Sequence, residues 1–361
     1  MKKIILILLL TPVLSYAVSS GTFTLRETGG DFASLSLAEA GLQGNLRSTV
    51  TLNIDQTWTS SDTTPVTITG WTTYSTAPFI IQAINSGRHA GVWDDTKYKF
   101  SPRSTDITAL TLVEKFIEID GLQIEPINTN VDSNAFAITF NQDTAGTRYK
   151  ISNCILRHSF GDKNGNTQAG IYAQVGNFRS EYYFWNNIIY DFGIGIRQDG
   201  STAGTTWYIY NNTFYKTDYS GTGITIQDDY NPNHLYLRMK NNIVEGSVST
   251  TTCYNFRFSS NFIDFSSACN VSSDNTSPNT EYRFQKALFV ATTDFHLLTT
   301  DTASYAKGRN LSADPLLAFN TDNANAVRPL NWSINAIDIS TPTVVVATQR
   351  RMRFKRPLCS E

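Results

Sequence analysis

Short runs in which apolar and polar residues alternate recur along the middle of the chain. A polar turn rich in asparagine follows each run, and a second short apolar run follows the turn. Alternation with a period of two is typical of half-buried β-strands. Five such copies align at residues 149–159, 182–192, 207–217, 235–247 and 256–266. Their aligned asparagines are Asn153, Asn187, Asn212, Asn242 and Asn261.

A third short strand is predicted between the copies. It reads AFAITF, GIYAQV, GIGIRQ and GITIQD at residues 135–140, 170–175, 193–198 and 223–228. Three short strands in roughly 27 residues cannot bury an apolar face alone, but stacked coils share one interior. We therefore expect a solenoid in which the recurring asparagines form a ladder at one corner. An antiparallel β-sandwich is the alternative, but it does not explain why the same asparagine recurs.

The repeated Asn-Asn turns and Gly-Ile-x-Ile strands resemble those of the pectin-lyase-like superfamily, in particular its secreted and phage-associated members. The resemblance is strongest over residues 116–266. It implies an all-β fold, a right-handed parallel β-helix solenoid. It indicates the fold well and the function poorly, because one fold hosts many activities.

Both ends of this region also resemble the superfamily. Residues 29–46 read as a short N-terminal capping helix, with a Ser36-x-x-Glu39 capping box and a glycine beyond its end. Such a helix would plug the open end of a solenoid. Residues 294–312 and 321–339 look like a closing region, although Ser-Tyr-Ala replaces the Ser-Pro-Ala of the superfamily there.

The first residues have the pattern of a secretory signal peptide. Two lysines at positions 2 and 3 precede an apolar run, and Ser15-Tyr16-Ala17 forms a small-x-small cleavage site. The apolar run is shorter than the ~20 residues that a membrane-spanning helix needs. We therefore expect secretion or display at the cell surface, without stable membrane insertion after cleavage.

The chain then divides into four predicted parts. They are a signal peptide at 1–17, an N-terminal cap at 18–48, a parallel β-helix domain at 49–340 and a basic C-terminal tail at 341–361. The formal net charge of the whole chain is −2, which argues against nucleic acid as a partner.

Stacking the third strands predicts one cluster of charged residues. Strands GIGIRQ and GITIQD align at their first glycines, Gly193 and Gly223. The alignment then gives three neighbouring pairs: Arg197 with Gln227, Gln198 with Asp228, and Asp199 with Asp229. Equivalent residues of adjacent coils lie ~4.8 Å apart. We therefore expect the arginine and the three aspartates to cluster at one strand end, where like charges raise the pKa of one carboxyl group.

This cluster has three interpretations. Paired carboxylates ~5 Å apart suit a retaining glycosidase, and a wider pair suits an inverting one. In a polysaccharide lyase the aspartates would hold Ca²⁺ through oxygen ligands, and Arg197 would act as the base or a charge clamp. The third interpretation is a set of polar turn residues on a solvated edge. Among the enzyme motifs of the superfamily only the dipeptide Asp228-Asp229 occurs, and Gly-His-Gly, Arg-Ile-Lys and Trp-x-Asp-His are absent.

Aromatic residues make up 12% of the chain and offer a second route to function. Tyr182, Trp207 and Tyr236 fall near the starts of successive first strands, and Tyr190 and Tyr215 follow the asparagine turns. Outward-facing rings would form a platform for sugars, because an aromatic face covers apolar C–H patches. Inward-facing rings would only stack in the core.

These observations favour an exported β-helix protein that binds a polysaccharide or a cell-surface glycan. One alternative is a polysaccharide-degrading enzyme, either a glycoside hydrolase or a polysaccharide lyase. The other is a structural or adhesive protein of a cell surface or virion. No P-loop, dinucleotide fingerprint or HExxH motif occurs, so no cofactor is predicted apart from Ca²⁺ at the aspartates. The oligomeric state is left open.

Overall fold

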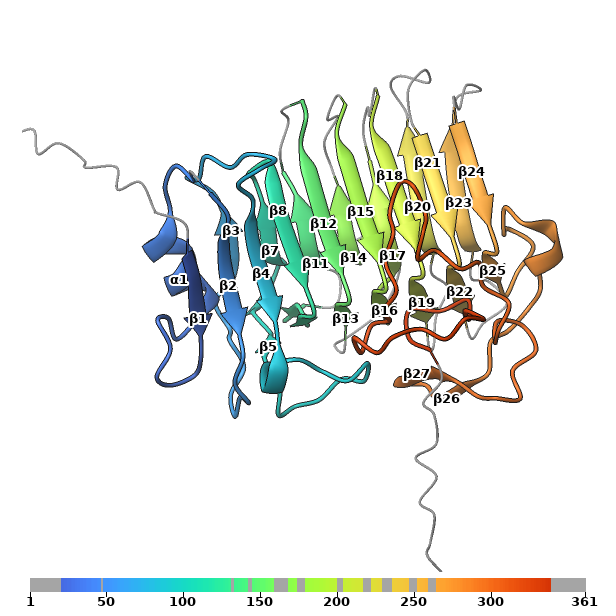
Figure 1. The fold of residues 1–361 in the computed structure, drawn as a ribbon, viewed down its shortest axis with the longest axis horizontal. Coiled ribbons are helices and arrows are strands. Elements are labelled where there is room, and N and C mark those ends of the chain that lie inside the picture. Colours follow the sequence, from blue (N-terminus) through green and yellow to red (C-terminus); the bar gives the residue numbers. More distant parts are fainter. Residues whose placement is uncertain are drawn as a thin grey trace, which may run out of the picture.

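The computed structural model describes residues 21–46, 48–130, 133–141, 145–158, 168–173, 179–199, 204–216, 222–228, 236–246, 252–258 and 264–338. Within these ranges, parallel strands stack into a solenoid with three long sheets (Figure 1). Over residues 79–258, each coil contributes one strand to sheet 1, then one to sheet 2 and one to sheet 3. The prediction of an all-β parallel β-helix with a short N-terminal helix is therefore confirmed.

The three sheets contain strands of two to seven residues. Sheet 1 contains β1 (Gly21–Leu25), β2 (Val50–Ile54), β4 (Phe79–Ala83), β8 (Phe116–Asp120), β12 (Arg148–Ser152), β15 (Glu181–Trp185), β18 (Thr206–Tyr210), β21 (Tyr236–Lys240) and β24 (Asp264–Ala268). Sheet 2 contains β5 (Lys99–Phe100), β9 (Gln123–Ile124), β13 (Ile155–Arg157), β16 (Ile188–Tyr190), β19 (Thr213–Lys216), β22 (Ile243–Gly246) and β25 (Val271–Ser272). Sheet 3 contains β3 (Val66–Ile68), β7 (Ile107–Leu112), β11 (Ala135–Phe140), β14 (Gln168–Ala173), β17 (Ile194–Gln198), β20 (Thr222–Asp228) and β23 (Thr252–Phe258).

The remaining elements are short. They are the helix α1 (Leu35–Leu42), the 3-10 helices η1 (Asn85–Gly87) and η2 (Thr280–Tyr282), the parallel pair β6 (Arg103–Ser104) and β10 (Ile127–Asn128), and the antiparallel pair β26 (Phe289–Ala291) and β27 (Asp294–Leu297).

The alternating pattern separates the core from the surface. On β15, Tyr182 and Phe184 are buried, whereas the residues on either side of them are half-exposed. The buried rings stack along the solenoid axis: the Phe140 ring lies 5.4 Å from that of Tyr182 and 5.9 Å from that of Phe184. Trp207 continues the row on the next coil and is fully buried. Burial of each such side chain stabilises the fold by about 1.5–3 kcal/mol.

An asparagine ladder lies at the corner between sheets 1 and 2, as predicted. The side-chain amide of Asn187 donates to Asn212 Oδ1 (3.0 Å), that of Asn212 to Asn242 Oδ1 (3.1 Å), and that of Asn242 to Asn270 Oδ1 (2.8 Å). All four asparagines are fully buried. Each amide therefore satisfies polar groups that the corner turns would otherwise bury without partners.

One of the five predicted ladder positions is wrong, and another lies outside the described residues. Asn153 lies one residue before the inner ladder, in a row of left-handed residues with Asn186, Asn211 and Asn241. Asn261 lies outside the described residues, and Asn270 holds the last position of the ladder. The fifth copy was misaligned because it joins two strands: β23 pairs with β20 in sheet 3, and β24 pairs with β21 in sheet 1.

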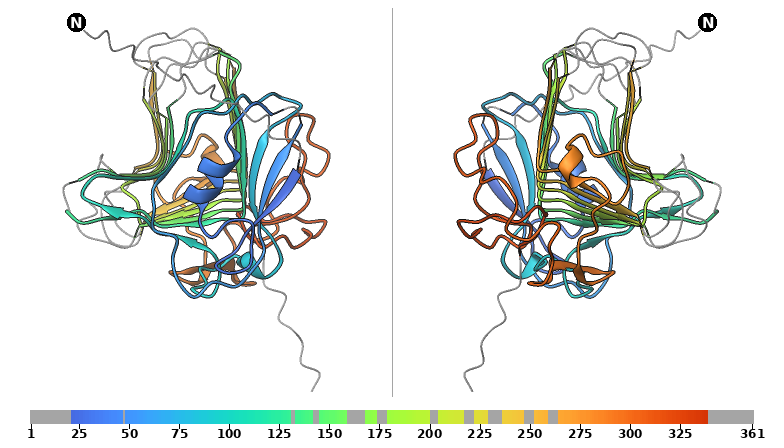
Figure 2. Two further views of the ribbon diagram at one scale, coloured as in Figure 1. Left: turned by 90° about the vertical axis from the view of Figure 1, so that its left-hand side faces the viewer. Right: turned by 90° about the vertical axis from the view of Figure 1, so that its right-hand side faces the viewer.

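Helix α1 plugs the first end of the solenoid (Figure 2). Its N-cap is Ser34, whose hydroxyl accepts a hydrogen bond from Leu37 N, so the predicted cap at Ser36 is wrong. Glu39 instead accepts hydrogen bonds from Gln43 and from Thr69 N. The predicted cap segment, residues 18–48, also contains a strand of the solenoid itself, because β1 pairs with β2.

A turn after β25 closes the opposite end. Asn279 Oδ1 accepts from the backbone and side-chain amides of Asn270 and so terminates the ladder. Ser277 is fully buried, and its hydroxyl donates to Asn270 O (2.6 Å). The later residues 303–338, which we call the strap, do not cap this end. They run back along the outside of the corner between sheets 1 and 2 (Figure 1).

Candidate functional site

The predicted pair Arg197 and Asp199 comes together at the end of β17. The Arg197 guanidinium donates to Asp199 Oδ2 through Nε (2.7 Å) and contacts the same oxygen through an Nη atom (2.6 Å). Both side chains are about one-quarter exposed, with 22% and 24% of their areas accessible. Because the pair is accessible, a ligand on this face could exchange hydrogen bonds with both groups.

The aspartates do not stack as predicted. Arg197 pairs with Thr225 and Gln198 with Ile226, so the next residue, Asp199, is level with Gln227 and not with Asp229. The equivalent glycines are Gly195 and Gly223, because Ile196 pairs with Ile224. A shift of two residues keeps every inward side chain inward, so alternation alone did not reveal it. Asp228 is the last residue of β20, and its side chain and all of Asp229 lie outside what the structure describes.

Two aromatic rings lie beside the arginine–aspartate pair. The Tyr172 hydroxyl donates to Asp199 Oδ2 (3.3 Å), and the Arg197 guanidinium carbon lies 5.3 Å from the centre of the Tyr172 ring. The Phe136 ring stacks on Tyr172 at 4.6 Å. Burial, and then the nearby Asp199 carboxylate, raise the pKa of Tyr172, so this hydroxyl stays protonated at neutral pH.

We call Phe136, Tyr172, Arg197 and Asp199 the sheet 3 cluster. It offers aromatic surface, a carboxylate that accepts hydrogen bonds and a guanidinium that donates them. Thr225 pairs with Arg197, and Gln227 is level with Asp199 on the adjacent strand. The described part of the chain therefore places no second carboxylate opposite Asp199. The cluster thus has the composition of a binding surface more than that of an acid–base pair.

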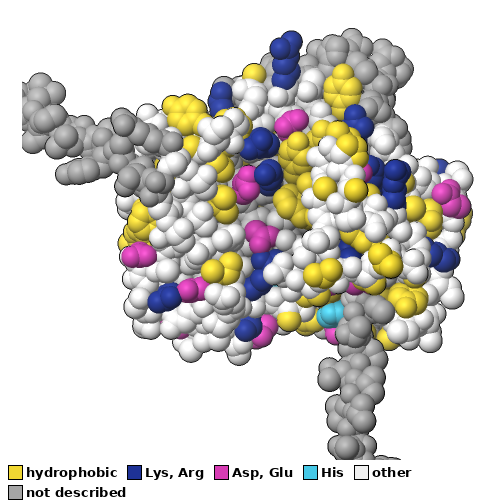
Figure 3. Space-filling view, viewed as in Figure 1, with side chains coloured by type: hydrophobic (Ala, Val, Ile, Leu, Met, Phe, Trp, Pro, Cys, Tyr) yellow, Lys and Arg dark blue, Asp and Glu magenta, His cyan; other side chains and the backbone are white. Residues whose placement is uncertain are grey.

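The aromatic rings on sheet 1 divide between the interior and the strap. Tyr182 and Trp207 point inward and are buried, and Tyr190 of the sheet 2 strand β16 is buried against Phe295. On the outer face, the rings of Tyr183 and Tyr208 stack at 4.4 Å with an interplanar angle of 4°. Figure 3 shows hydrophobic side chains gathered on the upper part of this face, with charged residues around them.

The strap covers much of this outer aromatic surface. Tyr208 and Tyr210 pack with Leu311 and Trp332 of the strap, and only 6% of Tyr208 and none of Tyr210 is exposed. A bound sugar therefore cannot stack on Tyr210 while the strap is in place. The predicted aromatic platform is mostly internal packing.

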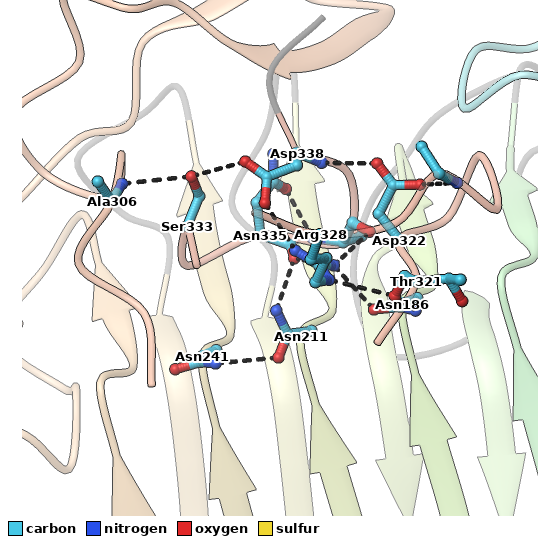
Figure 4. Close-up of polar contacts among 12 residues, drawn as sticks. Asn186, Asn211, Asn241, Ala306, Thr321, Asp322, Arg328, Ser333, Asn335 and Asp338 are labelled. Atoms are coloured by element: carbon cyan, nitrogen blue, oxygen red, sulfur yellow. Dashed lines mark hydrogen bonds and ion pairs between the residues drawn. The ribbon is translucent and has the colours of Figure 1, made fainter. Parts of the chain in front are cut away.

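Hydrogen bonds attach the strap to successive coils (Figure 4). The side-chain amides of the outer asparagines donate to strap carbonyls: Asn186 to Thr321 O (2.8 Å), Asn211 to Asn335 O (3.0 Å) and Asn241 to Arg309 O (2.8 Å). The left-handed backbone of these asparagines turns their side chains outward, toward the strap. Sequence reasoning identified the Asn-Asn pairs but assigned no role to the first asparagine.

Arg328 lies at the centre of the strap and was not predicted. Its guanidinium is fully buried and donates to Asn186 Oδ1, Asn335 O and Ala336 O, each at 2.9 Å, and forms an ion pair with Asp338 (3.4 Å). Burial lowers the pKa of Arg328 below its ordinary value. The Arg-Pro dipeptide at 328–329 was the available sequence signal, since it occurs in the closing region that the resemblance indicated.

Comparison with protein-family models, curated proteins and solved structures finds no match for this chain. Membership of the pectin-lyase-like superfamily therefore stays a prediction, while the parallel β-helix rests on the strand pairing. Over the described ranges, no three His, Cys, Asp or Glu side chains come together as a metal site. In the same part of the chain, no helix has both the length and the apolar character to cross a membrane.

Proposed function

We propose that this chain is an exported parallel β-helix protein that binds a polysaccharide or a cell-surface glycan. The observation that carries the proposal is the sheet 3 cluster, in which a partly exposed arginine–aspartate pair borders two stacked aromatic rings. Sugar rings present apolar C–H patches beside hydroxyl groups, so they suit a surface that combines aromatic faces with polar donors and acceptors.

Binding is favoured over cleavage because of the groups that contact Asp199. A general acid in a glycosidase needs a raised pKa and a second carboxylate at a defined separation. Asp199 instead forms an ion pair with Arg197 and accepts a hydrogen bond from the Tyr172 hydroxyl, and the described part of the chain places no second carboxylate opposite it. Hydrolase or lyase activity is the competing function, and the same protein preparation tests it.

The test is a glycan array followed by titration of the best ligand against Tyr172→Ala and Asp199→Asn. Each substitution should weaken binding by about tenfold or more, because each removes a stacking face or a charge-assisted acceptor. Lys150→Gln is the control, since Lys150 pairs with Glu118 on sheet 1. Release of reducing or unsaturated ends by the wild type, lost in Asp199→Asn, would favour the enzyme. Unchanged binding in both variants would overturn the proposed site.

A further inference from the structure

A pocket of about 290 Å³ opens on the outer face of sheet 1, where β8, β12, β15 and β18 begin. Its volume is near the lower end of the range for small-molecule sites, roughly 300 Å³. Four residues of one rung form its floor: Phe116, Arg148, Glu181 and Thr206 are paired in register from coil to coil. The pocket is separate from the sheet 3 cluster, so a ligand bound in it would be independent of the proposed function.

Arg148 is the first unusual residue of the pocket. Its guanidinium lies 5.6 Å from the centre of the Phe116 ring and donates to Ser75 O (3.2 Å). Two other half-buried arginines, Arg26 and Arg157, each contact a carboxylate at 2.7–2.9 Å. In the described part of the chain Arg148 contacts no carboxylate, although it is half-buried as they are. Its donors are therefore available to an anion.

Arg179 is the second unusual residue of the pocket. It has a φ of +54° and is exposed at the rim of the pocket. The equivalent positions of the neighbouring coils, two residues before the sheet 1 strand, are Gly146 and Gly204, with φ of +78° and +76°. Left-handed backbone suits glycine, and a residue with a long side chain there is strained. Glycine occupies this turn position in both neighbouring coils, whereas Arg179 places a charged side chain there.

The glycines on either side also leave room for that side chain. A Cβ atom at Gly204 would lie 3.2 Å from Arg179 Cγ, and a Cβ at Gly146 would meet nothing within 4 Å. Arg179 therefore lies between two bare backbone turns, beside the opening over Arg148. The pocket is thus lined by two arginines from adjacent coils.

The other polar groups can accept hydrogen bonds or donate them. The Glu181 carboxylate interacts with the Tyr183 hydroxyl, which lies on the same strand. Thr206 and Ser180 add hydroxyl groups to the lining. A ligand with an anionic group at the two arginines and hydroxyl groups toward Glu181 would match this distribution of charge.

We propose that this pocket binds a sugar that carries a phosphate or sulfate group, with the tetrahedral oxyanion held by Arg148 and Arg179. One guanidinium satisfies a planar carboxylate through two parallel hydrogen bonds. A tetrahedral oxyanion has further oxygens that face a second guanidinium. It is therefore favoured by two arginines from different coils, neither of which pairs with a carboxylate within the described ranges. The Phe116 ring and Glu181 then contact the sugar.

The test is calorimetric titration of the purified protein with a hexose 6-phosphate, a hexose 6-sulfate, inorganic phosphate and the uncharged hexose. The charged sugars should bind, the uncharged hexose should not, and Arg148→Gln and Arg179→Gly should each weaken binding about 10- to 100-fold, as loss of a charge-assisted hydrogen bond does. Arg103→Gln, at an exposed arginine outside the pocket, should bind like the wild type.

Arg179→Gly separates binding from folding. Glycine occupies both equivalent positions, so this variant should melt at or above the temperature of the wild type while its affinity falls. Affinities within twofold of the wild type for both pocket variants would overturn the proposal. Equal binding of inorganic phosphate and the hexose phosphate would show that the pocket does not recognise the sugar. Binding of the uncharged hexose at the same strength would show that it does not recognise the oxyanion.

Discussion

At the scale of single residues, the two asparagines of each turn have different tasks. The first, such as Asn211, adopts a φ of +52° and turns its side chain outward to the strap. The second, such as Asn212, turns inward and bonds the coils above and below. Asparagine suits both positions, because it tolerates left-handed backbone and its amide both donates and accepts.

Asn212→Ala should lower the free energy of unfolding by about 1–3 kcal/mol, because it leaves buried groups without partners on two coils. Asn212 Oδ1 accepts from the backbone and side-chain amides of Asn187, and its own amide donates to Phe184 O (2.9 Å). Urea unfolding followed by circular dichroism measures the change. Asn320→Ala, at an exposed asparagine of the strap, should change stability by less than about 0.5 kcal/mol. Equal effects would contradict the ladder as a source of stability.

Glu245 on β22 should make stability depend on pH. Burial raises the pKa of its carboxyl group from 4.5 to about 7, although Ala287 N donates to it (3.0 Å). Between these two values the unfolded chain loses a proton that the folded chain keeps. The free energy of unfolding should therefore fall as pH rises from about 4.5 to about 7, by about 3 kcal/mol from this residue, and then level off.

The check is Glu245→Gln, which cannot titrate but can still accept from Ala287 N. Other carboxyl groups contribute their own pH dependence, so the relevant quantity is the difference in unfolding free energy between variant and wild type at pH 4, 6 and 8. The free energy of unfolding of the variant should rise relative to that of the wild type as the pH rises. A difference that stays constant over this range would show that Glu245 ionises in the folded protein as it does in the unfolded chain.

At the scale of elements, the sequence pattern predicts strands better than their register. The pattern of β17 and β20 contains Gly-x-Gly-Ile twice, at 193–196 and 221–224, and pairing the wrong glycines moved Asp199 by two positions. Inward and outward faces were unaffected, so Arg197 and Asp199 were correctly placed on one face. The carboxylate cluster required the correct register, which depends on loop lengths that alternation does not encode.

The course of the strap along the solenoid could not be predicted from periodicity, because the strap contains no regular strand or helix. Over residues 303–338 its contacts are side chains that fill positions along the solenoid, such as Trp332 against Tyr208. Arg328 of the strap attaches it to the coils by donating to Asn186, which is 142 residues away in sequence. Contacts of that kind depend on the assembled coils, and no local propensity reports them.

Arg328→Met should release the strap before the coils unfold. The substitution removes the cation from the buried pair with Asp338 and the donors of three hydrogen bonds, which costs about 3–5 kcal/mol. Limited proteolysis with mass spectrometry should find early cuts within residues 303–338, whereas β-sheet circular dichroism persists. Arg309→Met is the matched control, since the Arg309 side chain is exposed and only its backbone bonds Asn241. Early cuts in the control variant, or none in Arg328→Met, would contradict this role of Arg328.

At the scale of the whole molecule, the solenoid is closed at both ends. Helix α1 covers the first coil, and the turn around Ser277 and Asn279 covers the last (Figure 2). The edge of β1 is also occupied, because Phe32 exchanges backbone hydrogen bonds with Thr24 and Arg26. A stack of coils can extend by adding another stack unless its ends are blocked, so these elements keep the ends from associating.

Removing the cap should therefore cause association through the exposed first coil. Leu35 and Leu42 are buried on the inner face of α1, whereas Leu37 is 57% exposed on its outer face. Leu35→Glu with Leu42→Glu should lift the helix and expose the interior beneath it, while Leu37→Glu carries the same kind of change without touching the core. Light scattering with size-exclusion chromatography should show a mass that rises with concentration in the double variant but follows the wild type in Leu37→Glu. Because the strands of each coil pair only with strands of the neighbouring coils, the β-sheet signal should largely persist in the double variant. Its complete loss, or a mass equal to that of the wild type at every concentration, would show that α1 does not act as an end cap.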